Sequence, residues 1–114
     1  MYYQLSVISI ANIMFFILLY SVYLHTYRIM STSKTTGLIE LITDATSLDG
    51  LKKKETFPGS LSEWYRASYQ GDAYAQAMER YVGSMAGYSI VCYLLAIKDR
   101  HNGNIMVDTR GSII

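Results

Sequence analysis

Apolar residues recur at spacings of three and four through the last long segment before a polar loop, and this is the clearest pattern in the chain. The spacing predicts a core helix over residues 73–97 with one apolar face. Residues 88–97 contain no charged side chain, which predicts that this end of the helix is enclosed nearly all round. The predicted face consists of Tyr74, Ala77, Met78, Tyr81, Met85, Tyr88, Val91, Cys92 and Leu95.

Shorter apolar runs with polar connections precede this helix. Strands are predicted over residues 22–30 and 37–42, with a polar turn at 31–36 between them. Residues 43–47 are interpreted as a connection that leaves the second strand. The pattern therefore predicts two strands that are close together along the chain.

Residues 52–60 are predicted to form a surface loop, because they combine three consecutive lysines with Pro58 and Gly59. Ser60 or Ser62 is expected to cap a short helix that ends near Tyr69. At the end of the chain, the segments 105–107 and 112–114, apolar except for Ser112, flank residues 108–111, which is typical of a hairpin.

Residues 5–24 contain no charged side chain and are long enough to cross a bilayer as a helix. Polar residues such as Asn12 interrupt the run, and no basic residue precedes it. Two interpretations remain open for residues 1–21: a buried apolar helix, or a membrane segment.

Net charge and cysteine content exclude some kinds of binding partner and site. The formal net charge is +1, from 10 Lys and Arg against 9 Asp and Glu, so no global field attracts nucleic acid or an anionic membrane. The single cysteine, Cys92, excludes an intrachain disulfide and a multi-cysteine zinc site. The three lysines at 52–54 are interpreted as a solvated loop, with contact to anionic lipid headgroups as the alternative.

The polar loop at residues 99–104 carries the candidate chemistry. Asp99 and His101 are two residues apart, a pattern that can organise proton transfer, and the Asn104 amide oxygen can bind a hard cation such as Mg²⁺. The alternative is a plain helix end, with Lys98 and Arg100 facing the helix dipole and a turn at residues 102–103.

The string KDRHNGNIM at residues 98–106 resembles the D-R-H-x-x-N catalytic loop of the phosphatidylinositol 3- and 4-kinase family. It looks like the form found in the phosphatidylinositol 4-kinases, and the stretch LITDATS at 41–47 resembles the type III beta enzymes. Further segments resemble the family in the same order, and together they cover residues 22–114: YRI at 27–29, GLIE at 37–40, TSL at 46–48 and SMAGYSIVCYLL at 84–95.

The resemblance implies an α+β chain, residues 22–114 being part of a protein-kinase-like fold. This part comprises the end of the N-lobe, the hinge, and the helical start of the C-lobe through the catalytic-loop hairpin. Tyr27 is then expected to line the inner adenine pocket, and Ile39 to occupy the gatekeeper position. Glu40 and Ile42 are expected to offer hinge backbone groups to adenine.

In the catalytic loop, the resemblance assigns Asn104 as a Mg²⁺ ligand. Asp99 and His101 match the residues that accept the inositol hydroxyl proton and stabilise the transition-state charge. Arg100 is expected to brace the loop. The implied cofactors are ATP and Mg²⁺. The implied substrate is phosphatidylinositol, reached by peripheral contact with a cytosolic membrane face, at the Golgi for a beta-like enzyme; no nucleic acid partner is expected.

The phosphate-covering loop, the ATP-binding lysine and the D-F-G acid of the family have no counterpart in these 114 residues. We therefore expect the isolated chain to be inactive. The leading hypothesis is a piece of a lipid kinase, and the alternatives are a catalytically dead remnant that serves in binding and a small single-span membrane protein. A protein kinase is not expected, because that family orders its loop H-R-D.

Overall fold

The computed structural model describes residues 24–114, which combine helices and strands as the α+β prediction requires. The apolar helix predicted over residues 1–21 lies outside the described residues, and so does nearly all of the possible membrane span. Within residues 24–114, no helix is long and apolar enough to cross a membrane. The described elements are β1 (Ile29–Ser31), β2 (Gly37–Ile39), β3 (Ala45–Ser47), α2 (Leu48–Lys52), α3 (Leu61–Ser68), α4 (Asp72–Leu94) and β4 (Met106–Asp108).

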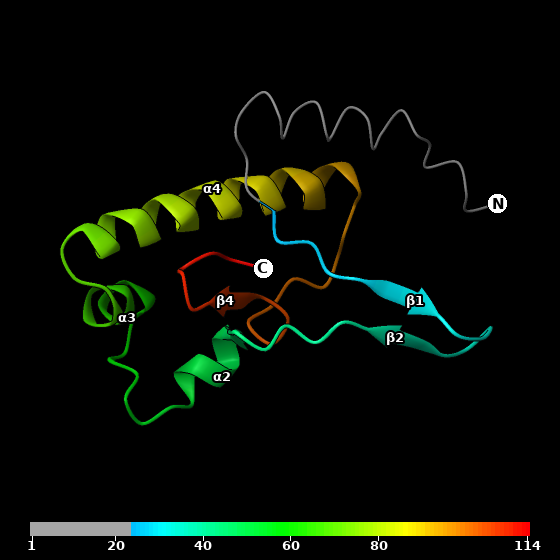
Figure 1. Cartoon of the computed structure of the whole chain (residues 1–114), viewed down its shortest axis with the longest axis horizontal. Coiled ribbons are helices and arrows are strands. Elements are labelled where there is room, and N and C mark those ends of the chain that lie inside the picture. The colour runs from blue at the N-terminus through cyan, green and yellow to red at the C-terminus, as the bar shows by residue number, and fades with distance from the viewer. Residues whose placement is uncertain (1–23) are drawn as a thin grey trace.

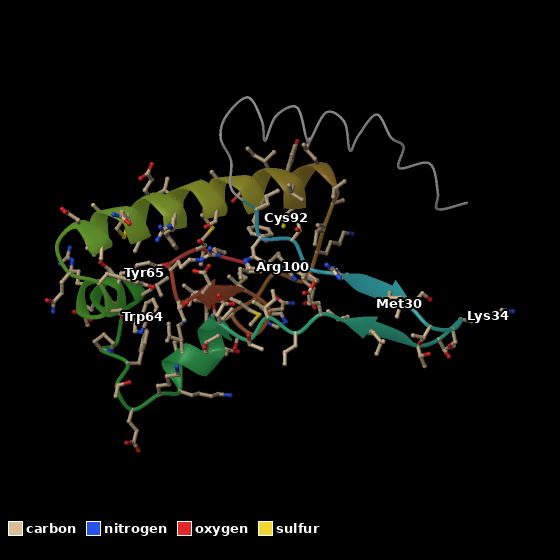
Figure 2. All side chains as sticks on the ribbon, viewed as in Figure 1. Met30, Lys34, Trp64, Tyr65, Cys92 and Arg100 are labelled. Carbon is tan, nitrogen blue, oxygen red and sulfur yellow. The ribbon has the colours of Figure 1, made fainter. Side chains whose placement is uncertain are left out.

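Strands β1 and β2 form an antiparallel ribbon that projects from the helical part of the chain (Figure 1). Met30 and Lys34 lie on this projection, far from Trp64 and Tyr65 in α3 (Figure 2). Ile29 pairs with Ile39, and every residue of both strands is exposed. The ribbon is therefore held mainly by its own backbone hydrogen bonds within the described structure.

Both strands are shorter than predicted, and the contact between Arg28 and Glu40 explains where the ladder stops. The Glu40 N–H donates to the Arg28 carbonyl at 2.9 Å, as a continuing ladder would require. The Arg28 N–H, however, donates to the Glu40 carboxylate at 2.8 Å. Because a side chain takes the place of a backbone acceptor, regular pairing ends here, and the predictions of strand over residues 22–28 and 40–42 are wrong for the described part.

Residues 45–47 were expected to be a connection, but they form β3 and pair antiparallel with β4. Ala45 lies opposite Asp108, and Ser47 opposite Met106. Helix α2 follows at once, capped by the Ser47 hydroxyl, which accepts from the Gly50 N–H at 3.1 Å. Lys52 therefore ends a helix instead of beginning a loop. A strand this short is specified by its partner strand, which is far away in the sequence, so local composition does not reveal it.

Helix α3 begins after Ser60, which is the one of the two predicted candidates that caps it. The Ser60 hydroxyl accepts from the Glu63 N–H at 3.2 Å and also donates to the Glu63 carboxylate at 3.0 Å. This pair satisfies an N–H group that the first helical turn would otherwise leave without a partner.

Helix α4 buries the predicted face but not the predicted end. Ala77 is fully buried, and Tyr81 and Tyr88 pack against the core. Tyr93, by contrast, is 85% exposed and Leu94 is 54% exposed, so the prediction of an enclosed end is wrong for the described residues. The reason is that the described elements lie on one side of α4 only (Figure 1). The helix ends at Leu94, short of the expected residue 97, and Ala96 then adopts a positive φ of 51°.

The predicted hairpin at the end of the chain is confirmed. Val107 bridges Ile113, and Met106 and Ile114 exchange backbone hydrogen bonds of 2.9 Å in both directions. Val107 and Ile113 are buried in the core together with Leu51, Tyr65 and Ala77. The hairpin is thus the central layer against which α2, α3 and α4 pack.

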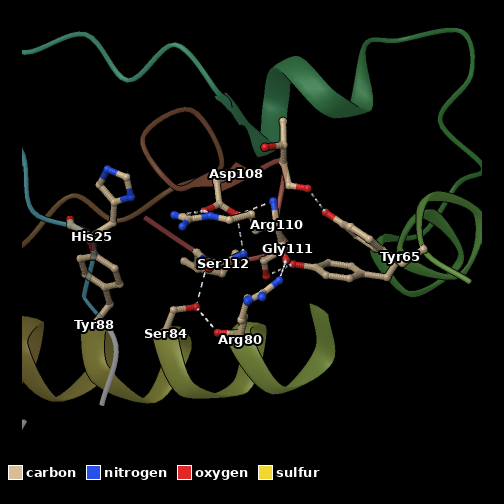
Figure 3. A network of polar contacts seen from close by, with 12 residues as sticks. His25, Tyr65, Arg80, Ser84, Tyr88, Asp108, Arg110, Gly111 and Ser112 are labelled. Carbon is tan, nitrogen blue, oxygen red and sulfur yellow. Dashed lines mark hydrogen bonds and ion pairs between the residues drawn. The ribbon is translucent and has the colours of Figure 1, made fainter. Parts of the chain in front are cut away.

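A buried carboxylate closes the turn of this hairpin (Figure 3). Asp108 accepts from the backbone N–H groups of Arg110 at 2.9 Å and Ser112 at 2.7 Å, and pairs with the Arg110 guanidinium at 3.1 Å. Its side chain is fully buried, and a buried carboxylate needs such partners to offset the loss of hydration. Gly111, at φ +90°, passes so close to Ala77 that a Cβ would lie 2.9 Å from the alanine Cβ.

Two helices hold the hairpin by hydrogen bonds. The Tyr65 hydroxyl of α3 donates to the Gly111 carbonyl at 2.7 Å. The Ser84 hydroxyl of α4 accepts from the Ile113 N–H at 2.8 Å and donates to the Arg80 carbonyl at 2.7 Å. We call these contacts of Tyr65, Ser84 and Asp108 the hairpin latch.

Ser84→Ala is expected to destabilise the fold by about 1–3 kcal/mol, because it leaves the buried Ile113 N–H without an acceptor. Chemical denaturation with the change in free energy of unfolding as the readout tests this. Ser89→Ala is the matched control, since the Ser89 hydroxyl only donates to the Met85 carbonyl on the same helix and is exposed. Equal unfolding midpoints for the two variants would contradict the role given to Ser84.

Burial raises the pKa of Tyr65 well above its ordinary value of 10.0, with further contributions from Tyr69, Tyr81 and Asp108. The neutral phenol is therefore favoured by folding. Its contribution to stability is complete below pH 10 and is lost as the pH rises beyond 10, where the unfolded chain releases the proton more readily. Unfolding free energies measured from pH 8 to 11 should fall, and the fall should be shallower in Tyr65→Phe. An identical pH dependence in both proteins would contradict this.

Candidate active site

The candidate loop connects α4 to β4, and its start has an unusual backbone. Asp99 adopts a positive φ of 62°, a left-handed conformation that is uncommon outside glycine, although aspartate and asparagine tolerate it best. The Asp99 side chain is 83% exposed. Left-handed residues held by surrounding contacts are concentrated at functional sites, and this conformation turns the Asp99 carboxylate toward solvent beside the rest of the loop.

A single amide closes the loop. The Asn104 side-chain oxygen accepts from the His101 N–H at 3.0 Å, and its side-chain nitrogen donates to the Asp99 carbonyl at 2.6 Å. The backbone N–H of Asn104 also donates to the His101 carbonyl at 3.0 Å. Arg100 reaches the Asn104 carbonyl only at 3.4 Å, so its bracing contribution is weak. Asn104 thus brings Asp99 and His101 together.

The imidazole of His101 is oriented by both of its nitrogens. Nδ1 accepts from the Gly103 N–H at 3.0 Å, and Nε2 lies 3.7 Å from a carboxylate oxygen of Asp99. Because Nδ1 acts as an acceptor, the neutral ring carries its hydrogen on Nε2. The His101 side chain is 59% exposed, so Nε2 and the Asp99 carboxylate present a donor and an acceptor side by side at the surface.

Helix α2 anchors the other side of the loop. The Asp49 N–H donates to the Asn102 carbonyl and the Leu48 N–H donates to the Ile105 carbonyl, each at 2.9 Å. The first N–H groups of a helix have no partner inside the helix, so they are available for such bonds. With β4 following at Met106, the loop is fixed at both ends to the core and its hairpin latch.

The four residues expected around adenine form a second group, on and next to the β1–β2 ribbon. Tyr27 is 45% exposed and Ile39 is 70% exposed. The Glu40 N–H is engaged with Arg28, whereas the Glu40 carbonyl and the backbone groups of Ile42 have no hydrogen-bond partner among residues 24–114. Within that range no hydrogen bond joins this group to residues 99–104.

The described residues contain no cluster of three or more His, Cys, Asp or Glu side chains suited to hold a metal ion. The loop offers the Asn104 amide oxygen and the Asp99 carboxylate as side-chain ligands. Mg²⁺ keeps several waters and is bound in proteins through one or two side-chain oxygens together with substrate phosphates, so this sparse donor set is compatible with it. It is not compatible with a structural zinc site.

An open cavity of about 240 Å³ lies elsewhere, between the β3–β4 pair and helices α2 and α3. Its walls include Leu51, Lys54, Trp64 and Tyr69. No residue of the loop at 99–104 lines it, so it is not part of the candidate site.

Sequence reasoning missed the residues that support the loop. The pattern predicts Gly103 only as a turn residue, and it leaves Leu48 and Asp49 between a predicted connection and a predicted surface loop. The hairpin latch was also missed, although an acid followed three residues later by glycine at residues 108–111 was a signal for a closed turn.

Comparison with known proteins identifies the family of the chain. The family model for phosphatidylinositol 3- and 4-kinase matches residues 5–114. Phosphatidylinositol 4-kinase beta 1 of Arabidopsis thaliana is 43% identical over 94 residues, which are 81% of this chain and 8% of that protein. Phosphatidylinositol 4-kinase of Dictyostelium discoideum is 43% identical over 95 residues, which are again 81% of this chain and 8% of that protein. Phosphatidylinositol 4-kinase beta of Sorex araneus is 42% identical over 91 residues, which are 77% of this chain and 11% of that protein.

The chain therefore spans between 8% and 11% of the length of these curated relatives. The matched range includes both the loop at 99–104 and residues 27–42, which contain the residues expected around adenine. The chain belongs to the phosphatidylinositol 3- and 4-kinase family.

Proposed function

We propose that residues 24–114 supply the hinge and the catalytic loop of a phosphatidylinositol 4-kinase. The observation that carries the proposal is the closed loop itself, in which the Asn104 side chain bonds to the backbone of Asp99 and His101, and the Asp99 carboxylate lies 3.7 Å from the Nε2 of His101. The names of the relatives support the lipid substrate, since those compared above are phosphatidylinositol 4-kinases. We place the substrate hydroxyl at the 4-position of the inositol ring for the same reason.

In the proposed reaction the 4-hydroxyl oxygen forms a bond to the γ-phosphorus of ATP, and the bond from that phosphorus to the β–γ bridging oxygen breaks. ADP leaves, and the hydroxyl proton passes to the Asp99 carboxylate. The Nε2–H of His101 donates to the phosphoryl oxygens as charge develops on them. Phosphoryl transfer depends mainly on positioning and electrostatic stabilisation, which a rigid loop with an adjacent donor and acceptor provides.

Asn104 is the residue proposed to hold Mg²⁺. Its side-chain oxygen accepts one hydrogen bond, from His101, and a carbonyl oxygen has a second lone pair. The ion, when bound, neutralises charge on the ATP phosphates. Asn104 at the same time keeps the loop closed, so one side chain couples the metal position to the position of Asp99.

The hinge group is proposed to hold the adenine ring. The Glu40 carbonyl and the Ile42 backbone have no hydrogen-bond partner among residues 24–114, which leaves them free to bond to adenine. The Glu40 N–H is already bonded to Arg28, so the proposal uses only the carbonyl of that residue. Tyr27 and Ile39 supply exposed apolar surface beside it.

We further propose that the complete protein acts peripherally at a cytosolic membrane face, with the Golgi as the compartment for a beta-like enzyme. No nucleic acid partner is proposed, since the net charge is only +1. The isolated 114-residue chain is proposed to be inactive, because the phosphate-covering loop, the ATP-binding lysine and the metal-binding D-F-G acid of the family have no counterpart in it.

The experiment is a lipid kinase assay of the full-length product of the gene that encodes this chain. Purified protein is incubated with phosphatidylinositol vesicles, Mg²⁺ and ATP, and the product is separated into its positional isomers. We expect phosphatidylinositol 4-phosphate from the full-length protein and none from the 114-residue chain. A full-length protein that binds the vesicles but transfers no phosphate would support the dead remnant instead, and phosphorylation at another position would refute the assigned substrate position.

A further inference from the structure

We propose that Tyr88 is a positioning residue for nucleotide binding, because its hydrogen bond to residue 25 anchors the residues expected around adenine to the helix that leads to the catalytic loop. The inference rests on the proposed function, since it takes residues 27–42 as the adenine end of the nucleotide site. It adds to that function a residue that lies outside both predicted sites.

The contact joins two parts of the chain that are far apart in sequence. The Tyr88 hydroxyl of α4 donates to the His25 carbonyl at 2.6 Å, and the contact is partly buried (Figure 3). The His25 Nδ1 is also buried. The residues that follow, 26–41, are all exposed. Residue 25 is therefore the point at which the adenine segment, defined here as residues 26–42, meets the packed part of the described structure.

The adenine segment has a second anchor just beyond its other end, where Ala45 pairs with Asp108 in the β3–β4 ladder. Between the two anchors, the hydrogen bonds that residues 26–42 make among the described residues stay within the ribbon and its turn. A two-stranded ribbon alone is only marginally stable in water, so its position depends on what holds its ends. Within residues 24–114, loss of the Tyr88 contact leaves only one of these two anchors.

The helix that carries Tyr88 leads directly to the catalytic loop. Beyond the end of α4, the N–H groups of Leu95 and Ile97 still donate to helix carbonyls at 2.9 Å, which fixes the chain almost as far as Asp99. An ATP molecule held at adenine by one group and at its phosphates by the other must reach both at once. A site whose two ends are already held in place loses less conformational freedom on binding, which favours affinity. Tyr88 supplies this link between the two ends.

Tyr88→Phe in the full-length gene product tests the link, because it removes the hydroxyl and keeps the ring that packs against the core. We expect the KM for ATP to rise about three- to tenfold, the scale of one lost hydrogen bond, and kcat to change less than about twofold. The split is expected because the hydrogen bonds that close the catalytic loop do not involve Tyr88. The KM for phosphatidylinositol should stay unchanged.

Tyr93→Phe is the matched control, since it makes the same chemical change on the same helix at a side chain that is 85% exposed. It should leave both kinetic constants unchanged. A lower kcat without a higher KM for ATP in Tyr88→Phe would show that Tyr88 only stabilises the fold, because a smaller folded fraction reduces the rate at every ATP concentration. That result, or two unchanged constants, would overturn the inference. A failure of the proposed function would instead appear as an inactive unmutated protein.

Hydrogen exchange followed by mass spectrometry tests the anchor without kinase activity. In the full-length gene product, peptides covering residues 26–42 should exchange at least about twofold faster in Tyr88→Phe, because local opening of the ribbon costs less when one of its ends is released. Peptides covering residues 105–114 should exchange alike in both proteins, since Tyr65 and Ser84 hold the hairpin. Unchanged exchange over residues 26–42 would overturn the inference even if the gene product transfers no phosphate.

Discussion

Asp99→Asn is expected to reduce lipid phosphorylation by the full-length gene product at least about a hundredfold, the scale associated with the loss of a general acid or base. The substitution removes the only carboxylate within reach of His101 Nε2 in the described structure, where the two groups are 3.7 Å apart. It should not disturb the backbone, because asparagine also tolerates the left-handed conformation that Asp99 adopts at φ 62°. The loss should therefore appear in kcat, with the unfolding midpoint unchanged.

The matched control is Asp44→Asn, the same chemical change at an exposed carboxylate beside the open cavity. It should retain the activity of the unmutated protein. Activity of Asp99→Asn above half of the unmutated level would exclude Asp99 as the proton acceptor. A matching loss in Asp44→Asn would show that the assay responds to charge in general and not to the loop.

Asn104→Ala is expected to have a comparable effect for two combined reasons. It removes the proposed metal-binding oxygen, and it removes both side-chain bonds that close the loop, to the His101 N–H and the Asp99 carbonyl. We expect kcat to fall about a hundredfold or more and the Mg²⁺ concentration for half-maximal rate to rise. Steady-state rates measured over a range of Mg²⁺ concentrations give both quantities.

Asn104→Asp separates the two contributions. It keeps an oxygen that can bind the metal and accept from His101, but it loses the donor to the Asp99 carbonyl at 2.6 Å. We expect its dependence on Mg²⁺ to stay close to that of the unmutated protein while kcat remains reduced. If both variants required the same Mg²⁺ concentration as the unmutated protein, Asn104 would not be a metal ligand.

Some elements could be predicted because their causes are local. The repeat of apolar residues through α4 identifies its buried face, and Ser60 with Glu63 marks the start of α3. The hairpin at 105–114 follows from two apolar runs around a turn-forming segment. In each case the residues that decide the structure lie within a few positions of one another.

Other features depend on contacts between distant parts of the chain. Strand β3 exists because β4 lies beside it, and the Arg28–Glu40 contact that ends the ribbon replaces a backbone acceptor by a side chain. The end of α4 is exposed although its apolar run predicts burial. An apolar run does not identify which other part of the protein covers it. No element among residues 24–114 covers this end.

In the candidate site, too, some features could be predicted from the sequence and others could not. The identities of Asp99, His101 and Asn104 could be taken from the motif. The motif does not show that Asn104 closes the loop or that the Gly103 N–H donates to the imidazole of His101. These depend on the left-handed turn at Asp99 and on the anchoring bonds from α2. The motif therefore indicates the chemistry, and the fold shows how the groups are held.

The most direct test of the central claim exchanges the segment itself. Residues 24–114 replace the matching segment of the Dictyostelium discoideum phosphatidylinositol 4-kinase, which is 43% identical over the aligned region, and the chimera is assayed for phosphatidylinositol 4-phosphate. We predict that the chimera produces this lipid and that Asp99→Asn in the same chimera abolishes production. A folded chimera that makes none, or one whose activity is unaffected by Asp99→Asn, would contradict the assignment of this segment as the catalytic loop of a phosphatidylinositol 4-kinase.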